Sequence, residues 1–203
     1  MLQACLLAII AGYADTIGYI RYEAFAGLMT GNTIFLGIEL ATGKFGAAAF
    51  HAGIIAIFLA GVVISRVLMR VGLEAWHALS ITSVILVLCG FASHDWGALM
   101  LALAMGMQNS AANRFNGVAL NTVFVTGNLQ KLGEGLVAWI WHHTHGQPHP
   151  SDGVAIFGFV WLAYAVGAAT GAFAHAALAY PLLLPAAILP FIMLAPKSAT
   201  PKP

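Results

Sequence analysis

The chain has 203 residues, of which 61% are hydrophobic and only 7% are charged, and its mean hydropathy is +0.89. A soluble globular domain carries about 25% charged residues, so this composition excludes that class and predicts an integral membrane protein. The formal net charge is +1, and the eight Lys and Arg are scattered along the sequence. This pattern offers no basic surface to a polyanion, so we exclude nucleic acid as a partner. Because the composition is that of a membrane protein, we expect the lipid bilayer as a partner.

The N-terminal segment is expected to be a retained first span. The run "MLQACLLAIIAGYADTIGYI" has neither the basic region nor the small-residue cleavage site of a secretory signal, and it contains Asp15. The two cysteines, Cys5 and Cys89, lie inside apolar segments. This placement predicts packing residues and does not indicate a disulfide.

Apolar segments alternate with short polar or glycine-containing joints along the whole chain. They lie at about residues 2–20, 25–42, 47–70, 76–92, 97–114, 118–141, 152–178 and 180–195. The second and the sixth are interrupted near their middle by Thr-Gly-Asn, at 30–32 and 126–128. A simple helical span needs about 20 uninterrupted apolar residues. We therefore predict an all-α membrane protein with about six full transmembrane helices and two segments that are discontinuous at Thr-Gly-Asn.

Matches at a nearly constant spacing predict two related halves, 1–95 and 96–203, within a single integral membrane domain. At an offset of 94 the small residues of the first segment fall on those of the fifth, namely Ala4, Ala8, Gly12 and Thr16 on Ala98, Ala102, Gly106 and Ser110. At an offset of 96 the two Thr-Gly-Asn motifs coincide, and at 106 the third segment matches the seventh, with Phe58 and Gly61 on Tyr164 and Gly167. Small residues at every fourth position let helices approach closely in lipid, so the first helix of each half is predicted to be central.

The orientation of the halves depends on whether the Thr-Gly-Asn segments cross the membrane. If they re-enter, each half has three spans and the halves are inverted; if they cross, each half has four spans and the halves are parallel. With a cytoplasmic N-terminus, re-entrant segments leave only Arg21 and Lys44 outside, whereas eight crossings divide the cations almost evenly. We therefore prefer the inverted arrangement.

The Thr-Gly-Asn motifs supply the candidate substrate site. A helix break in lipid is tolerated only where it is buried in protein or lines a watery cavity, and a helix that restarts at Thr33 or Leu129 directs N–H groups and a positive dipole end toward it. Two such breaks at matching places are typical of a transporter's binding site. The candidate substrate-binding residues are Thr30, Gly31, Asn32, Thr33, Gln108, Asn109, Thr126, Gly127 and Asn128. The alternative is structural, with the threonines as helix caps and the asparagines bonded to neighbouring helices.

Three carboxylates are further candidates. Asp15 lies deep in the first apolar run, where an ionisable group is costly, so it is the candidate for proton coupling. An interfacial position or a structural bond to an arginine is the alternative. Glu39 and Glu134 follow the two breaks by about two helical turns and are candidates for an exit path. Interfacial solvation, or for Glu134 a helical ion pair with Lys131, is the other explanation.

The stretch 142–149 contains four histidines, His142, His143, His145 and His149. Their spacing is not that of a structural or catalytic zinc site, so we expect a solvated loop, no metal and no other cofactor. The sequence also lacks a nucleophile elbow, a zinc-protease motif, a P-loop and a dinucleotide fingerprint, so no enzyme is predicted. A membrane hydrolase stays open as an alternative, because Asp15 and His175 could meet in the fold.

Four stretches carry a resemblance to a known family, namely "GYADTIGY" (12–19), "LMTGNTIFLG" (28–37), "AMGMQN" (104–109) and "FVTGNLQKLG" (124–133). They are similar to the YoaK-like group of bacterial multi-span inner-membrane proteins, a domain of unknown function, over nearly the whole chain. The resemblance implies a multi-pass location in the cell inner membrane and adds weight to Asp15 and the Thr-Gly-Asn motifs. It supplies no substrate.

Together these patterns predict a small-solute transporter or permeation protein with its site between the two Thr-Gly-Asn breaks. Helix N-termini favour a small anionic or strongly polar solute, and Asp15 would couple its movement to protons. The alternative is a non-transporting membrane sensor or helper subunit. The faces of small residues also make a homo-oligomer possible.

Overall fold

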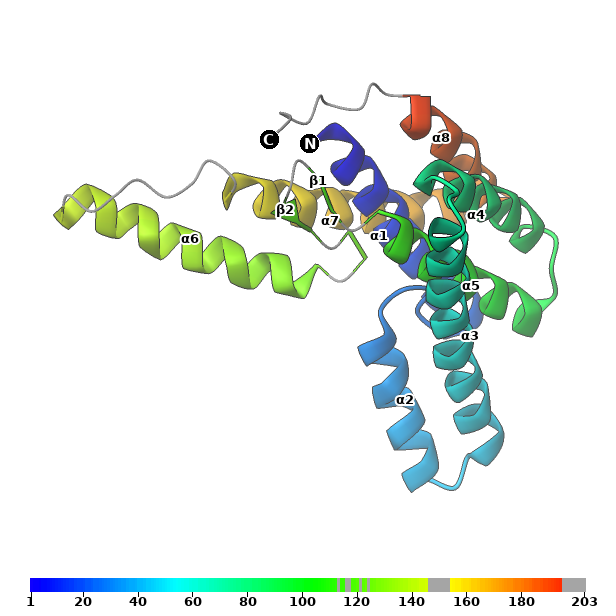
Figure 1. Ribbon diagram of the computed structural model, residues 1–203. Coiled ribbons are helices and arrows are strands. Elements are labelled where there is room, and N and C mark those ends of the chain that lie inside the picture. The colour runs from blue at the N-terminus through cyan, green and yellow to red at the C-terminus, as the bar shows by residue number, and fades with distance from the viewer. Residues whose placement is uncertain (113, 116–117, 121, 124, 146–153, 195–203) are drawn as a thin grey trace.

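The structure of the chain, a computed structural model, describes residues 1–112, 114–115, 118–120, 122–123, 125–145 and 154–194. These residues form eight helices and one pair of two-residue strands (Figure 1). The elements are α1 (Leu2–Tyr22), α2 (Met29–Ala41), α3 (Phe45–Arg70), α4 (Ala75–Cys89), α5 (His94–Ala111), β1 (Arg114–Phe115), β2 (Val118–Ala119), α6 (Thr126–His145), α7 (Val154–Ala177) and α8 (Leu183–Leu194). Each of the eight predicted apolar segments overlaps one helix, and the prediction of a helical fold is confirmed.

Three of the helices are long and apolar enough to cross a membrane: α1 with 21 residues, α3 with 26 and α7 with 24. The apolar helices α4 and α8 are shorter, with 15 and 12 residues. At 1.5 Å per residue α4 extends only about 22 Å, less than the hydrocarbon thickness of about 30 Å. Among the described residues, three of the six expected spans therefore have the length and the hydropathy of a full crossing.

Helices α1 and α5 form the centre of the bundle, and they run antiparallel. Near the start of α1 the carbonyl of Leu7 accepts a hydrogen bond of 3.0 Å from Gln108 Nε2, close to the end of α5. Near the end of α1, Gly18 lies against the side chain of Leu101, toward the start of α5. Both helices are buried over most of their length, as predicted for these two segments.

Glycine contacts hold the central helices against α3 and α7. A Cβ at Gly12 would collide with the carbonyl of Tyr164 in α7, and a Cβ at Gly106 would collide with the carbonyl of Phe58 in α3. The partner helices contribute glycines in return, because Gly167 lies against Ile9 and Gly61 against Leu103. This confirms that small residues pack these helices, α1 on α7 and α5 on α3, at backbone contact distance.

Helix α2 turns back onto α3 as an antiparallel hairpin, and α6 packs beside α7. In Figure 1 α2 and the first part of α3 point downward, and α6 and the first part of α7 extend to the left, whereas the later parts of α3 and α7 lie against the central helices. The tight connection between α2 and α3 includes Gly43 with a φ of +73°, a backbone conformation that favours glycine.

The Thr-Gly-Asn motifs do not interrupt helices as predicted. Helix α2 begins at Met29 and α6 at Thr126, so both motifs lie in a first helical turn with non-helical chain before them. The predicted restart points, Thr33 and Leu129, are inside these helices. The reason is visible in the first half, where the side chain of Asn32 bonds the backbone of Phe25 and so folds the preceding loop onto the helix start.

Candidate functional site

Asp15 is buried in α1, with only 3% of its surface exposed, and its carboxylate accepts three hydrogen bonds. The amides of Gly27 and Leu28 donate to Oδ1 at 2.6 and 3.2 Å. The hydroxyl of Tyr164 in α7 donates to Oδ2 at 2.5 Å. The carboxylate thus joins three parts of the chain: α1, α7 and the loop that leads into α2.

The Asp15 carboxylate lies at the N-terminus of α2, because its two amide donors directly precede Met29, the first residue of that helix. Free N–H groups and the helix dipole make such an end favourable for an anion. The sequence predicts a solute at this position. In the structure the protein's own carboxylate occupies it.

The loops before α2 and before α6 meet beside this carboxylate. A Cβ at Gly27 would strike the side chain of Val123, and it would lie 3.6 Å from Oδ2 of Asp15. Val123 is itself fully buried and precedes α6 by three residues. The chain segments that enter the two Thr-Gly-Asn helices therefore come together at Asp15, although the motifs themselves are not broken spans.

In the first motif, both polar atoms of the Asn32 side chain form hydrogen bonds with the backbone of Phe25. Its Oδ1 accepts from the Phe25 amide at 2.9 Å, and its Nδ2 donates to the Phe25 carbonyl at 2.8 Å. Gly31 provides the space for this arrangement, because a Cβ there would lie 2.6 Å from the Phe25 ring. Thr30 and Thr33 are exposed, and the Thr33 hydroxyl donates to the Met29 carbonyl at 2.8 Å.

The other predicted binding residues lie in several places. In the second motif Thr126 and Gly127 are exposed, and Asn128 is buried. Gln108 is fully buried between α1 and α5, where its Nε2 bonds Leu7. Its Oε1 has no hydrogen-bond partner among the described residues, and Asn109 beside it is half-buried.

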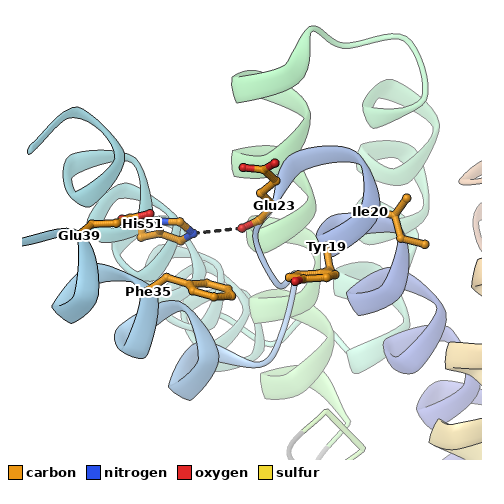
Figure 2. Close-up of a pocket in the computed structure, with 6 residues that line it drawn as sticks. All are labelled: Tyr19, Ile20, Glu23, Phe35, Glu39 and His51. Carbon is orange, nitrogen blue, oxygen red and sulfur yellow. Dashed lines mark hydrogen bonds and ion pairs between the residues drawn. The ribbon is translucent and has the colours of Figure 1, made fainter. Parts of the chain in front are cut away.

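A cavity of about 360 Å³ opens between the end of α1, α2 and the start of α3 (Figure 2). Its lining residues are Tyr19, Ile20, Glu23, Phe35, Glu39 and His51. Glu39, predicted to line a path, pairs through Oε2 with Nδ1 of His51 at 2.9 Å. The Nε2 atom of His51 lies 3.2 Å from the carbonyl of Glu23, the contact drawn as a dashed line in Figure 2.

His51 is not among the residues predicted from the sequence. The sequence nevertheless contains a signal for it. His51 lies near the start of one apolar segment, 12 positions after Glu39, the one glutamate of the preceding segment, and a glycine-containing turn separates the two segments. Two helices joined by a short turn pack as an antiparallel hairpin, which brings Glu39 and His51 together. The pairing could therefore have been found from the hairpin.

Glu134 lies elsewhere, exposed on α6, where its Oε1 accepts from Gln130 Nε2 at 2.9 Å. The neighbouring Lys131 places its Nζ 4.9 Å from the centre of the Phe157 ring in α7. A cation–π contact between α6 and α7 is therefore present at Lys131.

The histidine-rich stretch is helical for as far as the structure describes it, which corrects the prediction of a loop. Helix α6 continues through His145, and within it Nδ1 of His143 bonds the carbonyl of Trp139 at 2.9 Å. His149 lies outside the described residues. Within the described ranges no group of three or more His, Cys, Asp or Glu side chains is arranged to hold a metal ion.

Comparison with known proteins gives a family match. Residues 3–195 match the family described as "Protein of unknown function (DUF1275)". No curated protein and no solved structure matches the chain. The match covers nearly the whole sequence and assigns no activity, so any function has to be argued from the geometry.

Proposed function

We propose, for a chain that belongs to the DUF1275 family of proteins of unknown function, that it is a proton-coupled membrane transporter of a small polar or anionic solute. The observation that carries the proposal is the buried carboxylate of Asp15 at the N-terminus of α2. An ionisable group at such depth is costly and, in membrane proteins, typically belongs to a proton or solute pathway.

Protonation of Asp15 would change the contacts at this position. Charge-assisted hydrogen bonds are roughly twice as strong as neutral ones, so a proton on the carboxyl weakens its hold on the amides of Gly27 and Leu28. It also removes the negative charge that faces the positive end of α2. The same N–H groups then become available to an anionic group of a solute, which makes proton binding and solute binding favour one another.

The position of Asp15 also allows the proton to act on more than one helix. Its partner Tyr164 belongs to α7, and Gly27 in the loop before α2 lies against Val123 in the loop before α6. A change at one carboxyl therefore reaches the entry segments of both Thr-Gly-Asn helices. Transporters alternate their access through such rearrangement of one repeat against the other.

We further propose that the two halves are inverted repeats in a multi-pass protein of a bacterial inner membrane. Matched glycines with matched contacts support the repeat, because Gly12 on Tyr164 corresponds to Gly106 on Phe58 at the offsets found in the sequence. The antiparallel course of α1 and α5, the first helices of the two halves, supports the inversion. The resemblance to the YoaK-like group supports the location.

Liposome flux tests the proposal. Purified protein would be reconstituted with a pH-sensitive dye inside, and small carboxylates, phosphate and neutral polar solutes would be added outside in turn. We expect one solute class to drive proton entry, and we expect Asp15→Asn to lower the coupled flux at least tenfold. Asp95→Asn, an exposed carboxylate paired with His94, is the matched control and should leave the flux unchanged.

The proposal fails if no solute moves protons through well-folded protein, or if Asp15→Asn transports as the unmodified chain does. The first outcome is the one that a sensor or helper subunit predicts. Ligand binding without transport would then be visible as thermal stabilisation, which reaches about 2.7 kcal/mol at a ligand concentration of 100 times Kd.

A further inference from the structure

The cavity between α1, α2 and α3 has a floor of aromatic rings. Tyr19 and Phe35 line it, with ring centroids 6.3 Å apart and planes 16° from parallel. Phe25 stacks on both, at 5.2 Å from Tyr19 and 5.9 Å from Phe35. In Figure 2 the rings of Tyr19 and Phe35 lie below Glu23. Aromatic faces carry partial negative charge and attract cations.

The charged lining of this cavity is acidic. Glu23 and Glu39 are its acidic residues, the only other ionisable residues in the lining are His51 and Tyr19, and no Lys or Arg takes part. The side chain of Glu39 is 16% exposed, so its charge faces a partly dehydrated space in which an ion pair is less screened than in bulk water.

His51 does not offer a donor to an additional anion. Its Nδ1 faces Oε2 of Glu39 at 2.9 Å and its Nε2 faces the carbonyl of Glu23 at 3.2 Å. Both partners are acceptors, so a ring protonated on both nitrogens satisfies both contacts. Even with a charged imidazolium, two carboxylates against one cation leave the lining with one net negative charge.

The backbone at Glu23 is held in an uncommon conformation that shapes the cavity. Its φ of +54° is the only positive φ of a non-glycine residue among the described parts of the chain. A left-handed conformation is unfavourable for such a residue and persists where surrounding contacts impose it. Here the carbonyl of Glu23 is bonded to His51, and its amide caps α1 through Tyr19 at 3.0 Å. In Figure 2 this backbone turn directs the carbonyl of Glu23 toward His51, and the carboxylate of Glu23 lies on the side away from the rings.

We propose that this cavity is a binding site for a small organic ammonium ion, which would lie on the rings of Tyr19 and Phe35 with the carboxylates of Glu23 and Glu39 as its counter-charge. The volume of about 360 Å³ is at the small end of the range found for ligand pockets, about 300–1,000 Å³. The site stands on the geometry of this cavity and does not depend on the proposed proton-coupled transport. Its ligand has the opposite charge to the anion that the N-terminus of α2 favours.

Calorimetric titration of the maltoside-purified protein with choline tests the site. The control ligand is 3,3-dimethylbutan-1-ol, which has the same shape and no charge. We expect choline to bind at least tenfold more tightly than the alcohol, because only the cation gains from the rings and the carboxylates. Equal binding of the two, or no binding of choline, would overturn the proposal.

Two variants locate the bound cation. Tyr19→Leu removes an exposed ring and Glu39→Gln removes a charge, and each should weaken choline binding at least fivefold. Glu134→Gln, an exposed carboxylate on α6, should leave the affinity unchanged. Choline binding that survives both Tyr19→Leu and Glu39→Gln would place the cation elsewhere and overturn the assignment.

Asp15→Asn separates this site from the proposed transport. The ammonium site predicts unchanged choline affinity in that variant, whereas the transport proposal predicts a loss of solute-driven proton flux. Each proposal can therefore fail without the other.

Discussion

Tyr164 in α7 donates a hydrogen bond to Asp15 in α1 across 149 positions of the chain, with the two oxygens 2.5 Å apart. One turn before Asp15, Gly12 lies against the backbone of the same Tyr164. A close backbone contact between α1 and α7 and their buried polar contact thus occur at one place. A change of charge at Asp15 is therefore felt at a tight helix contact.

Replacing Tyr164 by Phe should reveal the strength of this contact. Hydrogen bonds to charged groups contribute about 1.5–3 kcal/mol, and the variant leaves a buried carboxylate with one donor fewer, so we expect the free energy of unfolding to fall by about that amount. Denaturant unfolding in maltoside micelles measures it. Tyr180→Phe, at an exposed tyrosine after α7, is the control and should stay within about 0.5 kcal/mol.

A double-mutant cycle with Asp15→Asn then isolates the pair. Because the two side chains are in direct contact, we expect a coupling energy of about 1 kcal/mol or more. Additive effects of Tyr164→Phe and Asp15→Asn would show that the hydrogen bond contributes nothing to stability.

The matched glycines of α1 and α5 should tolerate no side chain. In Gly12→Ala and Gly106→Ala the new methyl group meets a backbone carbonyl, of Tyr164 and Phe58 respectively, and the helices have to move apart. Overpacking of this kind costs about 1–3 kcal/mol, and the similar surroundings predict similar losses at both sites. Thermal unfolding of the two variants measures the loss.

Gly37→Ala provides the control within a helix, because a Cβ at this position in α2 has open space around it. Alanine is the better helix former by about 0.8–1 kcal/mol, so this variant should be as stable as the unmodified chain or more stable. If Gly12→Ala and Gly106→Ala were equally harmless, the helix backbones would not be in close contact at these two glycines.

The sequence predicts those features that depend on short-range pattern. Helix positions follow from hydropathy, and the glycine contacts follow from the four-residue spacing that placed Gly12 and Gly106 in equivalent positions. Asp15 stands out because a carboxylate is rare in an apolar run. Its three partners do not follow from the sequence, because two are backbone amides and the third is on a helix far along the chain.

The meaning of Thr-Gly-Asn is the part that pattern alone predicted wrongly. An apolar segment interrupted by polar residues is compatible with a broken span and with a helix that begins at the interruption. The choice depends on Asn32, which pairs with the backbone of Phe25 and so ends the loop before α2. The ammonium cavity was missed for a related reason, since His51 and Glu39 meet only after the α2/α3 hairpin has formed.

Asn32→Ala should unfold the loop before α2. The change deprives the amide and the carbonyl of Phe25 of their partner, and each buried unsatisfied polar group costs about 1–3 kcal/mol. We expect a loss of about 2 kcal/mol or more in the free energy of unfolding, together with weaker choline binding, because Phe25 supports the rings of Tyr19 and Phe35. The control is Thr33→Ala, at an exposed threonine one position later, for which both quantities should stay nearly constant.

If Asn32→Ala lost stability and kept full choline affinity, Phe25 would have no part in the cavity floor. If it lost neither, the amide of Asn32 would have no structural role, and its assignment as a substrate ligand would regain support.

The inverted arrangement predicts that the turn before α3 and the end of α6 lie on opposite sides of the membrane. A cysteine-free background is available through replacement of Cys5 and Cys89, neither of which forms a disulfide. Into it we would introduce Lys44→Cys and His145→Cys, both at exposed positions. In intact cells a membrane-impermeant thiol reagent should label the first at once and the second only after permeabilisation, because the positive-inside rule places Arg66 and Arg70, at the far end of α3, in the cytoplasm. Labelling of both positions from the same side would contradict the inversion and favour eight crossings with parallel halves.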